Sequence, residues 1–364
     1  MGDMIRVLAV ADPAVKAYVD KKSGILDGFG KKVVFDVFPW AEYYDTMMEV
    51  FAGKKDYDII MVAGHLWLHD FAKEGYLKEL HYDREDILPV IFEEMKDKGK
   101  LYLSPSFCDG HIICYRKSIL KEVLGELPKD VISPREYIDI AEKVYEHTGK
   151  PSLAMKAHSS EIFTDALPFL RMNGEDIYKD GEVNLKACTE GLREYCKLKK
   201  YAAVGTENYG NDEIARAIRE KEVPMATTWS GQMGVVIDGC VEKEDLGFTT
   251  FDTAWNVTWS FAISAGSKNE DAEEFLAYLR SLKIDKIAGK VSGAPVRESS
   301  YKDDSESPWY PCQLRMFENA KPLPVMERAG DKNGVLYEEI AKAFAGEISP
   351  EDALEKAYER IKII

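Results

Sequence analysis

The stretch Cys108-Asp109-Gly110-His111 places a thiol, a carboxylate and an imidazole side by side in the chain. A cysteine nucleophile needs a histidine within hydrogen-bond reach, and that histidine generally comes from elsewhere in the fold. On an extended strand, Cys108 and His111 point to opposite faces, so the spacing does not favour a catalytic cysteine. We interpret Asp109 and His111 instead as candidate ligand-binding residues.

His65 and His69 are four residues apart, which on a helix would place both on one face. The zinc protease motif also needs a glutamate directly after the first histidine, and residue 66 is leucine. We therefore predict no metal site. Neither the phosphate-binding nor the dinucleotide-binding glycine motif is present, so the sequence predicts no cofactor.

Tryptophans are the more informative residues, because five of them are expected at strand ends or in the loops beside them. They are Trp40, Trp67, Trp229, Trp255 and Trp259. For any single one, packing inside the protein is the stronger interpretation, but five such positions favour a binding surface. Indole faces stack on the C–H faces of sugar rings, while nearby amides, hydroxyls and carboxylates bind the ring hydroxyls.

Alternating strands and helices must position these residues. Apolar runs at 5–10, 31–40 and 57–63 predict strands, and helical spacing follows at 41–54 and 68–77. This alternation of strands and helices is typical of a parallel, doubly wound α/β sheet. Ligands of such sheets bind beyond the carboxyl ends of the strands.

Several candidate residues follow these predicted strand ends. Asp12 follows the first strand, Trp40 ends the second, and a loop with Gly64, His65 and Trp67 follows the third. A glycine there would let the main chain approach a ligand closely. Further along, residues 99–120 predict two short strands with Asp109-Gly110 between them.

The length of the chain and its net charge indicate how many domains to expect and which classes of binding partner are disfavoured. A chain of 364 residues is expected to form two domains. The formal charge of −16, from 48 basic and 64 acidic side chains, disfavours nucleic acid and anionic membrane surfaces as partners. No apolar run is long enough for a membrane span. The six cysteines show no zinc spacing, and we expect them to be reduced and mostly buried.

Several stretches, in one order along the chain, resemble those of family 1 of the extracellular solute-binding proteins. "YDIIMVAGHLWLHDFAKEGYLKEL" resembles the family's strand, ligand loop and helix, and "ALPFLRMNGEDIY" resembles its Leu-Pro-Phe-Leu segment. "IREKEVPMATTWSG" and "VTWSFAISAGSKNEDAEEFLAYL" also match the family pattern. Two departures concern the site: Val257-Thr258 replaces the usual Gly-Gly, and the segment after Trp229 lacks the common proline.

The resemblance implies a fold of two doubly wound α/β lobes joined by a multi-crossing hinge, as in type II periplasmic-binding proteins. Lobe one would be 1–110 plus 256–300, and lobe two 115–250 plus 305–364. The hinge crossings would lie near 110–114, 251–255 and 300–305. A ligand would bind in the interlobe cleft and stabilise a closed state.

The resemblance also implies a function, that of a substrate-binding receptor of an ABC importer. The ligand would be a carbohydrate, expected to be an oligosaccharide, and no bond would be made or broken. The partners would be the permease subunits of the transporter, and the receptor would be a monomer. We expect an extracellular or periplasmic protein, exported and anchored as a lipoprotein by a leader that this sequence does not include.

The expected substrate-binding residues come from both lobes. They are Asp12, Trp40, Gly64, His65, Trp67, Asp109, His111, Glu161, Trp229, Ser230, Trp255, Asn256 and Trp259. Two alternatives stay open: the same fold binding a non-sugar solute such as a polyamine or organic cation, and a glycosidase-like enzyme. Aromatic side chains and carboxylates bind cations as well as sugars.

Overall fold

The computed structural model describes residues 4–179, 182–302 and 307–364. The chain forms two compact units. Unit 1 comprises Met1–Asp109, Val257–Pro308 and Val325–Ala329, and unit 2 comprises Gly110–Asn256, Trp309–Pro324 and Gly330–Ile364. The division expected from the sequence did not include the return of Val325–Ala329 to unit 1.

Unit 1 is built on a sheet with the strand order β2-β1-β3-β13. The strands are β1 (Ile5–Val10), β2 (Val33–Phe38), β3 (Ile59–Ala63) and β13 (Asn256–Ile263). β1 pairs in parallel with β2 and β3, as the alternating pattern predicted, whereas β13 pairs antiparallel to β3. Every residue of β3 is buried, which explains its uninterrupted apolar sequence.

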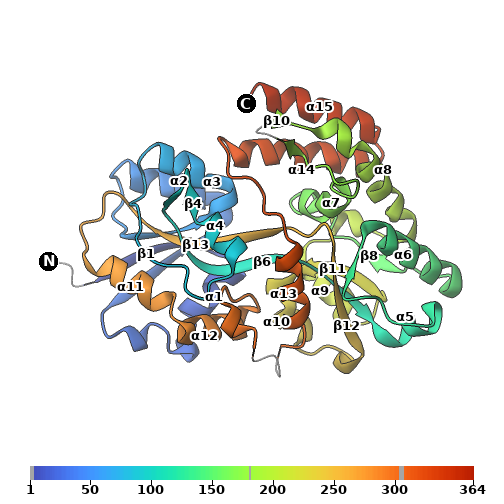
Figure 1. Ribbon diagram of the computed structural model, residues 1–364, viewed down its shortest axis with the longest axis horizontal. Helices are drawn as coiled ribbons and strands as arrows, with labels where there is room; N and C mark the ends of the chain where they lie inside the picture. The colour runs from blue at the N-terminus through green and yellow to red at the C-terminus, as the bar shows by residue number, and fades with distance from the viewer. Residues whose placement is uncertain (1–3, 180–181, 303–306) are drawn as a thin grey trace. The chain divides into compact units, whose positions relative to one another are not determined.

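Helices cover both faces of this sheet, and Figure 1 shows α2 and α3 on one face and α1, α11 and α12 on the other. The helices of unit 1 are α1 (Pro13–Val19), α2 (Trp40–Phe51), α3 (Gly64–Lys73), α4 (Pro89–Glu94), α11 (Asp271–Leu279) and α12 (Leu282–Ser292). A short hairpin of β4 (Lys96–Asp97) and β5 (Lys100–Leu101) follows α4. The predicted loop at 64–67 is wrong, because α3 begins directly at Gly64.

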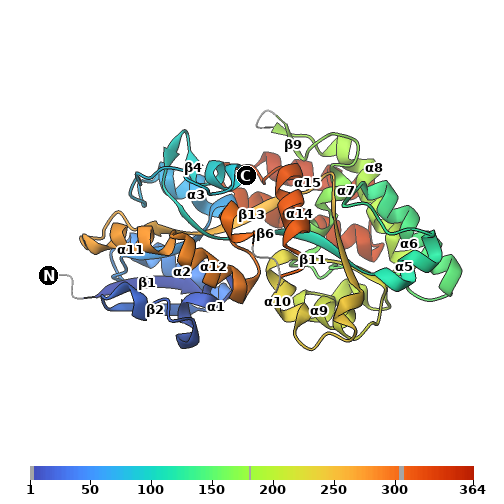
Figure 2. The same cartoon turned by 60° about the horizontal axis from the view of Figure 1, so that its bottom comes forward.

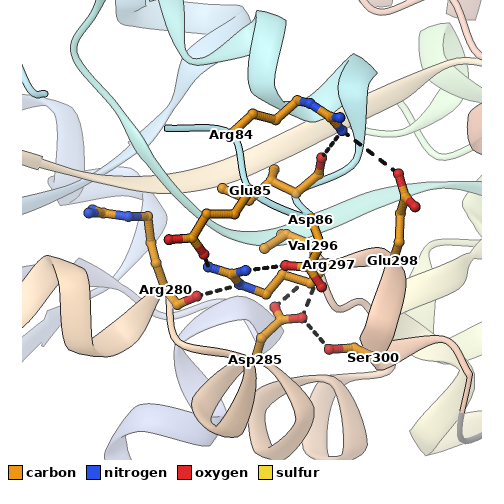
Figure 3. A network of polar contacts seen from close by, with 10 residues as sticks. Arg84, Glu85, Asp86, Arg280, Asp285, Val296, Arg297, Glu298 and Ser300 are labelled. Carbon is orange, nitrogen blue, oxygen red and sulfur yellow. Dashed lines mark hydrogen bonds and ion pairs between the residues drawn. The ribbon is translucent and has the colours of Figure 1, made fainter. Parts of the chain in front are cut away.

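The buried carboxylate of Asp285, on α12, links this helix to the segment 296–300 (Figure 3). Asp285 accepts hydrogen bonds from the main-chain N–H groups of Val296 and Arg297 and from the hydroxyl of Ser300. Figure 3 shows the Arg297 guanidinium beside the Glu85 carboxylate, to which it donates at 2.7 Å. Burial raises the pKa of Asp285 to about 6 in spite of its three donors.

In unit 2, β6 pairs with β11 and β12, β11 also pairs with β8, and β12 with β7. The strands are β6 (Ser104–Arg116), β7 (Val131–Ile132), β8 (Leu153–Ala154), β11 (Met225–Trp229) and β12 (Leu246–Phe251). The two short strands predicted within 99–120 are therefore wrong: β6 runs unbroken through Asp109-Gly110. A Cβ on Gly110 would lie 2.5 Å from the carbonyl oxygen of Trp255, so close packing requires the glycine.

The helices of unit 2 surround this sheet (Figure 2). They are α5 (Lys117–Leu124), α6 (Pro134–Thr148), α7 (Ile162–Leu170), α8 (Thr189–Lys197), α9 (Asn211–Arg219), α10 (Met233–Ile237), α13 (Tyr310–Asn319), α14 (Ala329–Ala345) and α15 (Pro350–Lys362). A two-strand pair of β9 (Tyr178–Lys179) and β10 (Glu182–Val183) lies between α7 and α8 in the sequence. α7 is buried along its whole length, which its apolar sequence requires.

The structure also bears on membrane-spanning segments and on the state of the cysteines. Within 4–179, 182–302 and 307–364, no helix is both long and apolar enough to cross a lipid bilayer. All six cysteines are free thiols, and four of them, Cys108, Cys114, Cys188 and Cys312, are buried. Burial raises the pKa of the Cys312 thiol to about 12, so this side chain behaves as a small apolar group.

Candidate functional site

The predicted site residues fall into two groups, one in each unit. In unit 1, Trp40 at the start of α2, Trp67 in α3 and Trp259 in β13 form one aromatic cluster. The rings of Trp40 and Trp67 stack at 5.6 Å between centroids, and Trp259 meets Trp40 edge to face at 6.0 Å. Tyr44 extends the cluster, with its ring 6.0 Å from that of Trp67.

Part of this tryptophan cluster lies in solvent. Trp40 is 54% exposed and Tyr44 is 46% exposed, whereas the other aromatic side chains described in this unit are buried or half-buried. A large indole left in water has a free apolar face, and a gathered set of such faces marks a ligand or partner site. The exposed indole of Trp40, packed against Trp67 and Trp259, can therefore offer a stacking face to a ring-shaped ligand.

Capping, packing or burial accounts for the other candidates in unit 1. Asp12 caps α1, because its carboxylate accepts a hydrogen bond of 2.8 Å from the main-chain N–H of Ala14. Gly64 is buried, and a Cβ there would lie 3.0 Å from the side chain of Leu103, so packing alone explains this glycine. Burial lowers the pKa of His65 to about 3, so its imidazole stays neutral at physiological pH.

In unit 2, His111, Trp229 and Trp255 form a second aromatic group. The imidazole lies 4.8 Å from each indole between ring centroids, and the two indoles meet edge to face at 5.0 Å. Trp255 is almost completely buried, whereas Trp229 is half-buried at the end of β11. Of the two tryptophans, only Trp229 has surface left for a ligand.

Charged side chains hold Trp229 in place. Its indole N–H donates a hydrogen bond of 2.9 Å to Glu161, at the start of α7. The ammonium group of Lys156 lies 5.2 Å over the indole ring and donates a hydrogen bond of 2.8 Å to Asn211. A cation over an indole face is a favourable contact, so Lys156 and Glu161 together fix the orientation of the ring.

Asp165, which the sequence interpretation missed, lies beside this group. Its Oδ1 is 3.7 Å from Nδ1 of His111, and its Oδ2 accepts a hydrogen bond of 2.8 Å from the hydroxyl of Tyr195. Burial raises the pKa of Asp165 to about 6. Burial and the charge of Lys156 lower the pKa of His111 well below its ordinary value. The sequence did contain a feature that could have identified Asp165, because it is a single carboxylate within the largely apolar stretch that forms α7.

The remaining candidates in unit 2, and Asp109 at the end of unit 1, are buried. Ser230 accepts a hydrogen bond of 2.9 Å from the side-chain amide of Gln313, so it links the segment after β11 to α13. Asn256 is 0% exposed at the first position of β13, and Asp109 is 8% exposed within β6. Their contact with a ligand stays a prediction.

Among the residues that the structure describes, no group of three or more histidine, cysteine, aspartate or glutamate side chains could hold a metal ion. A cavity of about 330 Å³ lies in unit 1 between the 82–85 segment and the corner joining α11 to α12. It is lined by Tyr82, Asp83, Glu85, Ala277, Arg280, Ser281, Leu282 and Arg297, none of which the sequence interpretation singled out.

Comparison with known proteins identifies the family. The family described as bacterial extracellular solute-binding protein matches residues 10–284. The chain belongs to this family. Membership confirms the resemblance drawn from the sequence, and it implies a location outside the cytoplasmic membrane and a role in binding a solute for a transporter.

Solved structures of low sequence identity share the fold of this solute-binding protein. Maltose-bound MalE3 of Thermotoga maritima is 20% identical, with a TM-score of 0.84 and 99% of each chain covered. The GacH receptor of Streptomyces glaucescens, solved unliganded and with acarbose, is 21% identical, with a TM-score of 0.83 and coverage of 100% of this chain and 98% of that one. The predicted type II periplasmic-binding-protein fold is confirmed.

A third solved structure has a smaller bound solute. It is an ABC transporter solute-binding protein from Agrobacterium radiobacter K84 in complex with ribitol. It is 19% identical to this chain, with a TM-score of 0.82 and coverage of 100% of this chain and 99% of that one. The family and these structures are binding proteins of transporters rather than enzymes.

Proposed function

We propose that this solute-binding protein is the receptor of an ABC importer for a carbohydrate, and that the carbohydrate is an oligosaccharide. The observation that carries the proposal is the half-exposed cluster of Trp40, Trp67 and Trp259 in unit 1, with Trp40 54% exposed. The exposed indole of Trp40, packed against Trp67 and Trp259, presents a stacking face for a sugar ring. The maltose, acarbose and ribitol bound by the structures of the same fold support this solute class.

The group in unit 2 complements that stacking face chemically. Trp229 offers a second stacking face. Glu161 accepts its indole N–H, His111 lies against its ring, and Asp165 lies beside His111. A sugar needs both kinds of contact, because its C–H faces are apolar and its edges are rows of hydroxyls. In the proposal, the indole of Trp229 stacks on a sugar ring and these polar side chains bind its hydroxyls.

A polyamine or organic cation is the main competing solute. Tryptophan faces and carboxylates also bind cations, and the net charge of −16 would attract them. The contact between Lys156 and Trp229 argues against this solute, since an internal ammonium group already lies 5.2 Å over that ring. A cationic ligand at Trp229 would be repelled by that charge.

A thermal-shift screen tests the proposal. The panel contains glucose, maltose, maltotriose, cellobiose and ribitol, with spermidine as the cationic probe. A cleft ligand at 100 times its dissociation constant adds about 2.7 kcal/mol of stability, which raises the melting temperature by several degrees. A shift by spermidine alone would replace the carbohydrate with the cationic solute. Mass spectrometry of the incubated oligosaccharides would reveal cleavage products if the protein were a glycosidase-like enzyme.

We also propose the partners, the oligomeric state and the location of this receptor. The receptor delivers its solute to the permease subunits of the transporter, acts as a monomer and is anchored outside the cell membrane as a lipoprotein. Metabolic labelling with a fatty acid in the native host tests the anchor. Sedimentation with and without the carbohydrate tests the monomer.

A further inference from the structure

Several buried polar atoms in unit 2 make no hydrogen bond within the described part of the chain. They are both ring nitrogens of His111, Oδ1 of Asp165 and Nε1 of Trp255. None of these side chains is more than 3% exposed. A buried polar atom without a partner costs about 1–3 kcal/mol, and this cost is removed when a polar group of a ligand reaches it.

We propose that His111 and Asp165 form a hydrogen-bonding pair that binds a hydroxyl group of the solute, and that solute affinity rises when Asp165 ionises. The inference rests on the proposed carbohydrate function and adds to it a control by pH.

The geometry leaves one oxygen of Asp165 available to the histidine. The hydroxyl of Tyr195 holds Oδ2 at 2.8 Å, whereas Oδ1 lies 3.7 Å from Nδ1 of His111. That distance is just beyond a hydrogen bond, so a small rotation of the imidazole closes it. The indoles of Trp229 and Trp255 flank the imidazole at 4.8 Å each and restrict it to such small movements.

The protonation state of Asp165 decides what His111 offers to a ligand. A neutral imidazole has one donor nitrogen and one acceptor nitrogen. When Asp165 is ionised, it accepts Nδ1–H, and Nε2 accepts the solute O–H in a charge-assisted chain. When Asp165 is protonated, it donates to Nδ1, and Nε2–H is left as a donor to the solute oxygen. The proton exchanges with solvent, and the charge-assisted chain is the stronger of the two.

Four titratable or charged side chains interact with the pair. They are Lys156 after β8, Glu161 at the start of α7, Tyr195 on α8 and Tyr137 on α6. Burial raises the pKa of Asp165 to about 6, while Tyr195 and Lys156 oppose the rise and Glu161 adds to it. Burial and Lys156 keep His111 neutral, since its pKa falls well below its ordinary value. The transition near pH 6 therefore belongs to Asp165.

Calorimetry on the full chain tests the inference. The probe is the carbohydrate of the panel above that gives the largest thermal shift, titrated between pH 5 and pH 7.5. We expect affinity to rise about tenfold over this range, which corresponds to one pKa unit of coupling. Binding near pH 6 should release protons, seen as a difference in apparent enthalpy between buffers of different ionisation enthalpy.

Two variants separate this role from a structural one. Asp165→Asn cannot ionise, so its affinity should be lower at pH 7.5 and independent of pH. Tyr195→Phe keeps the carboxylate but removes a hydrogen bond that favours its ionised form, so the midpoint should move to higher pH. A protein that binds carbohydrate with a flat pH profile, or a pH dependence that survives in Asp165→Asn, would overturn the inference. Absence of carbohydrate binding at every pH would instead overturn the proposed function, and the inference with it.

Discussion

The indole N–H of Trp229 donates a hydrogen bond of 2.9 Å to Oε2 of Glu161. This bond joins the end of β11 to the start of α7, and the ammonium group of Lys156 lies over the same ring. A side chain held in this way loses little conformational freedom when a ligand stacks on it. Trp229 is thus oriented before a solute arrives.

Removing the acceptor should weaken solute binding. Glu161→Ala frees the indole, and we expect the affinity for the screened carbohydrate to fall by about 1–2 kcal/mol, measured by calorimetry. Glu161→Gln keeps an acceptor oxygen for the indole and should lose less than half of that amount. Equal losses in the two variants would mean that the charge of Glu161, rather than the orientation of Trp229, matters for binding.

Trp40 and Trp255 should respond oppositely to truncation. Trp40→Ala removes a side chain that is 54% exposed, so we expect unchanged unfolding free energy and a loss of about 1–3 kcal/mol of carbohydrate affinity. Trp255→Ala creates a cavity at a position that is 1% exposed and should cost about 3–5 kcal/mol of stability. Urea unfolding and calorimetry on both variants check this pair. A large stability loss for Trp40→Ala would identify it as a packing residue.

Gly110 should not tolerate a side chain. Its added Cβ would lie 2.5 Å from the carbonyl oxygen of Trp255 and 2.6 Å from the sulfur of Met316. We expect Gly110→Ala to destabilise the protein by about 1–3 kcal/mol in urea unfolding. Gly334→Ala is the control, because a Cβ there meets nothing within 4 Å and alanine favours the helix α14. This control should be neutral or slightly stabilising; a similar loss at both positions would contradict the packing argument.

Asp285 should make stability depend on pH. Its pKa is about 6 in the folded protein and has an ordinary value of 3.8, so the folded state binds its proton more tightly. Its contribution is therefore present at low pH and is lost as pH rises from about 4 to about 6, by up to about 3 kcal/mol. Asp285→Asn does not titrate. The difference in unfolding free energy between the two proteins should fall over this window and stay constant above it.

A difference that stayed constant from pH 4 to pH 7 would show that Asp285 has the same pKa in the folded and unfolded chain. Urea unfolding at each pH gives the two free energies, and circular dichroism at pH 4 checks that both proteins are folded at the start. Because only the difference is compared, the other titrating groups of the chain cancel.

The local sequence was sufficient to predict the parallel strands β1, β2 and β3 of unit 1. The apolar run at 57–63 predicted a strand, and β3 (Ile59–Ala63) lies there, because an uninterrupted apolar run fits a strand covered on both faces. The same reasoning failed at Gly64 and at Asp109-Gly110. A glycine was interpreted as a break in each case, whereas close packing against Leu103 and Trp255 is what requires it.

The sequence by itself determined the fold class and the kind of residue that a solute would meet, since periodicity and tryptophan content are properties of the chain. Only the tertiary structure decided which tryptophans are available: Trp40 is largely exposed and Trp255 is buried, although both were predicted at strand ends or in the loops beside them. It also placed Asp165 beside His111, from a helix more than fifty residues away. Exposure and such pairings depend on how distant elements pack against one another, and no local pattern contains that information.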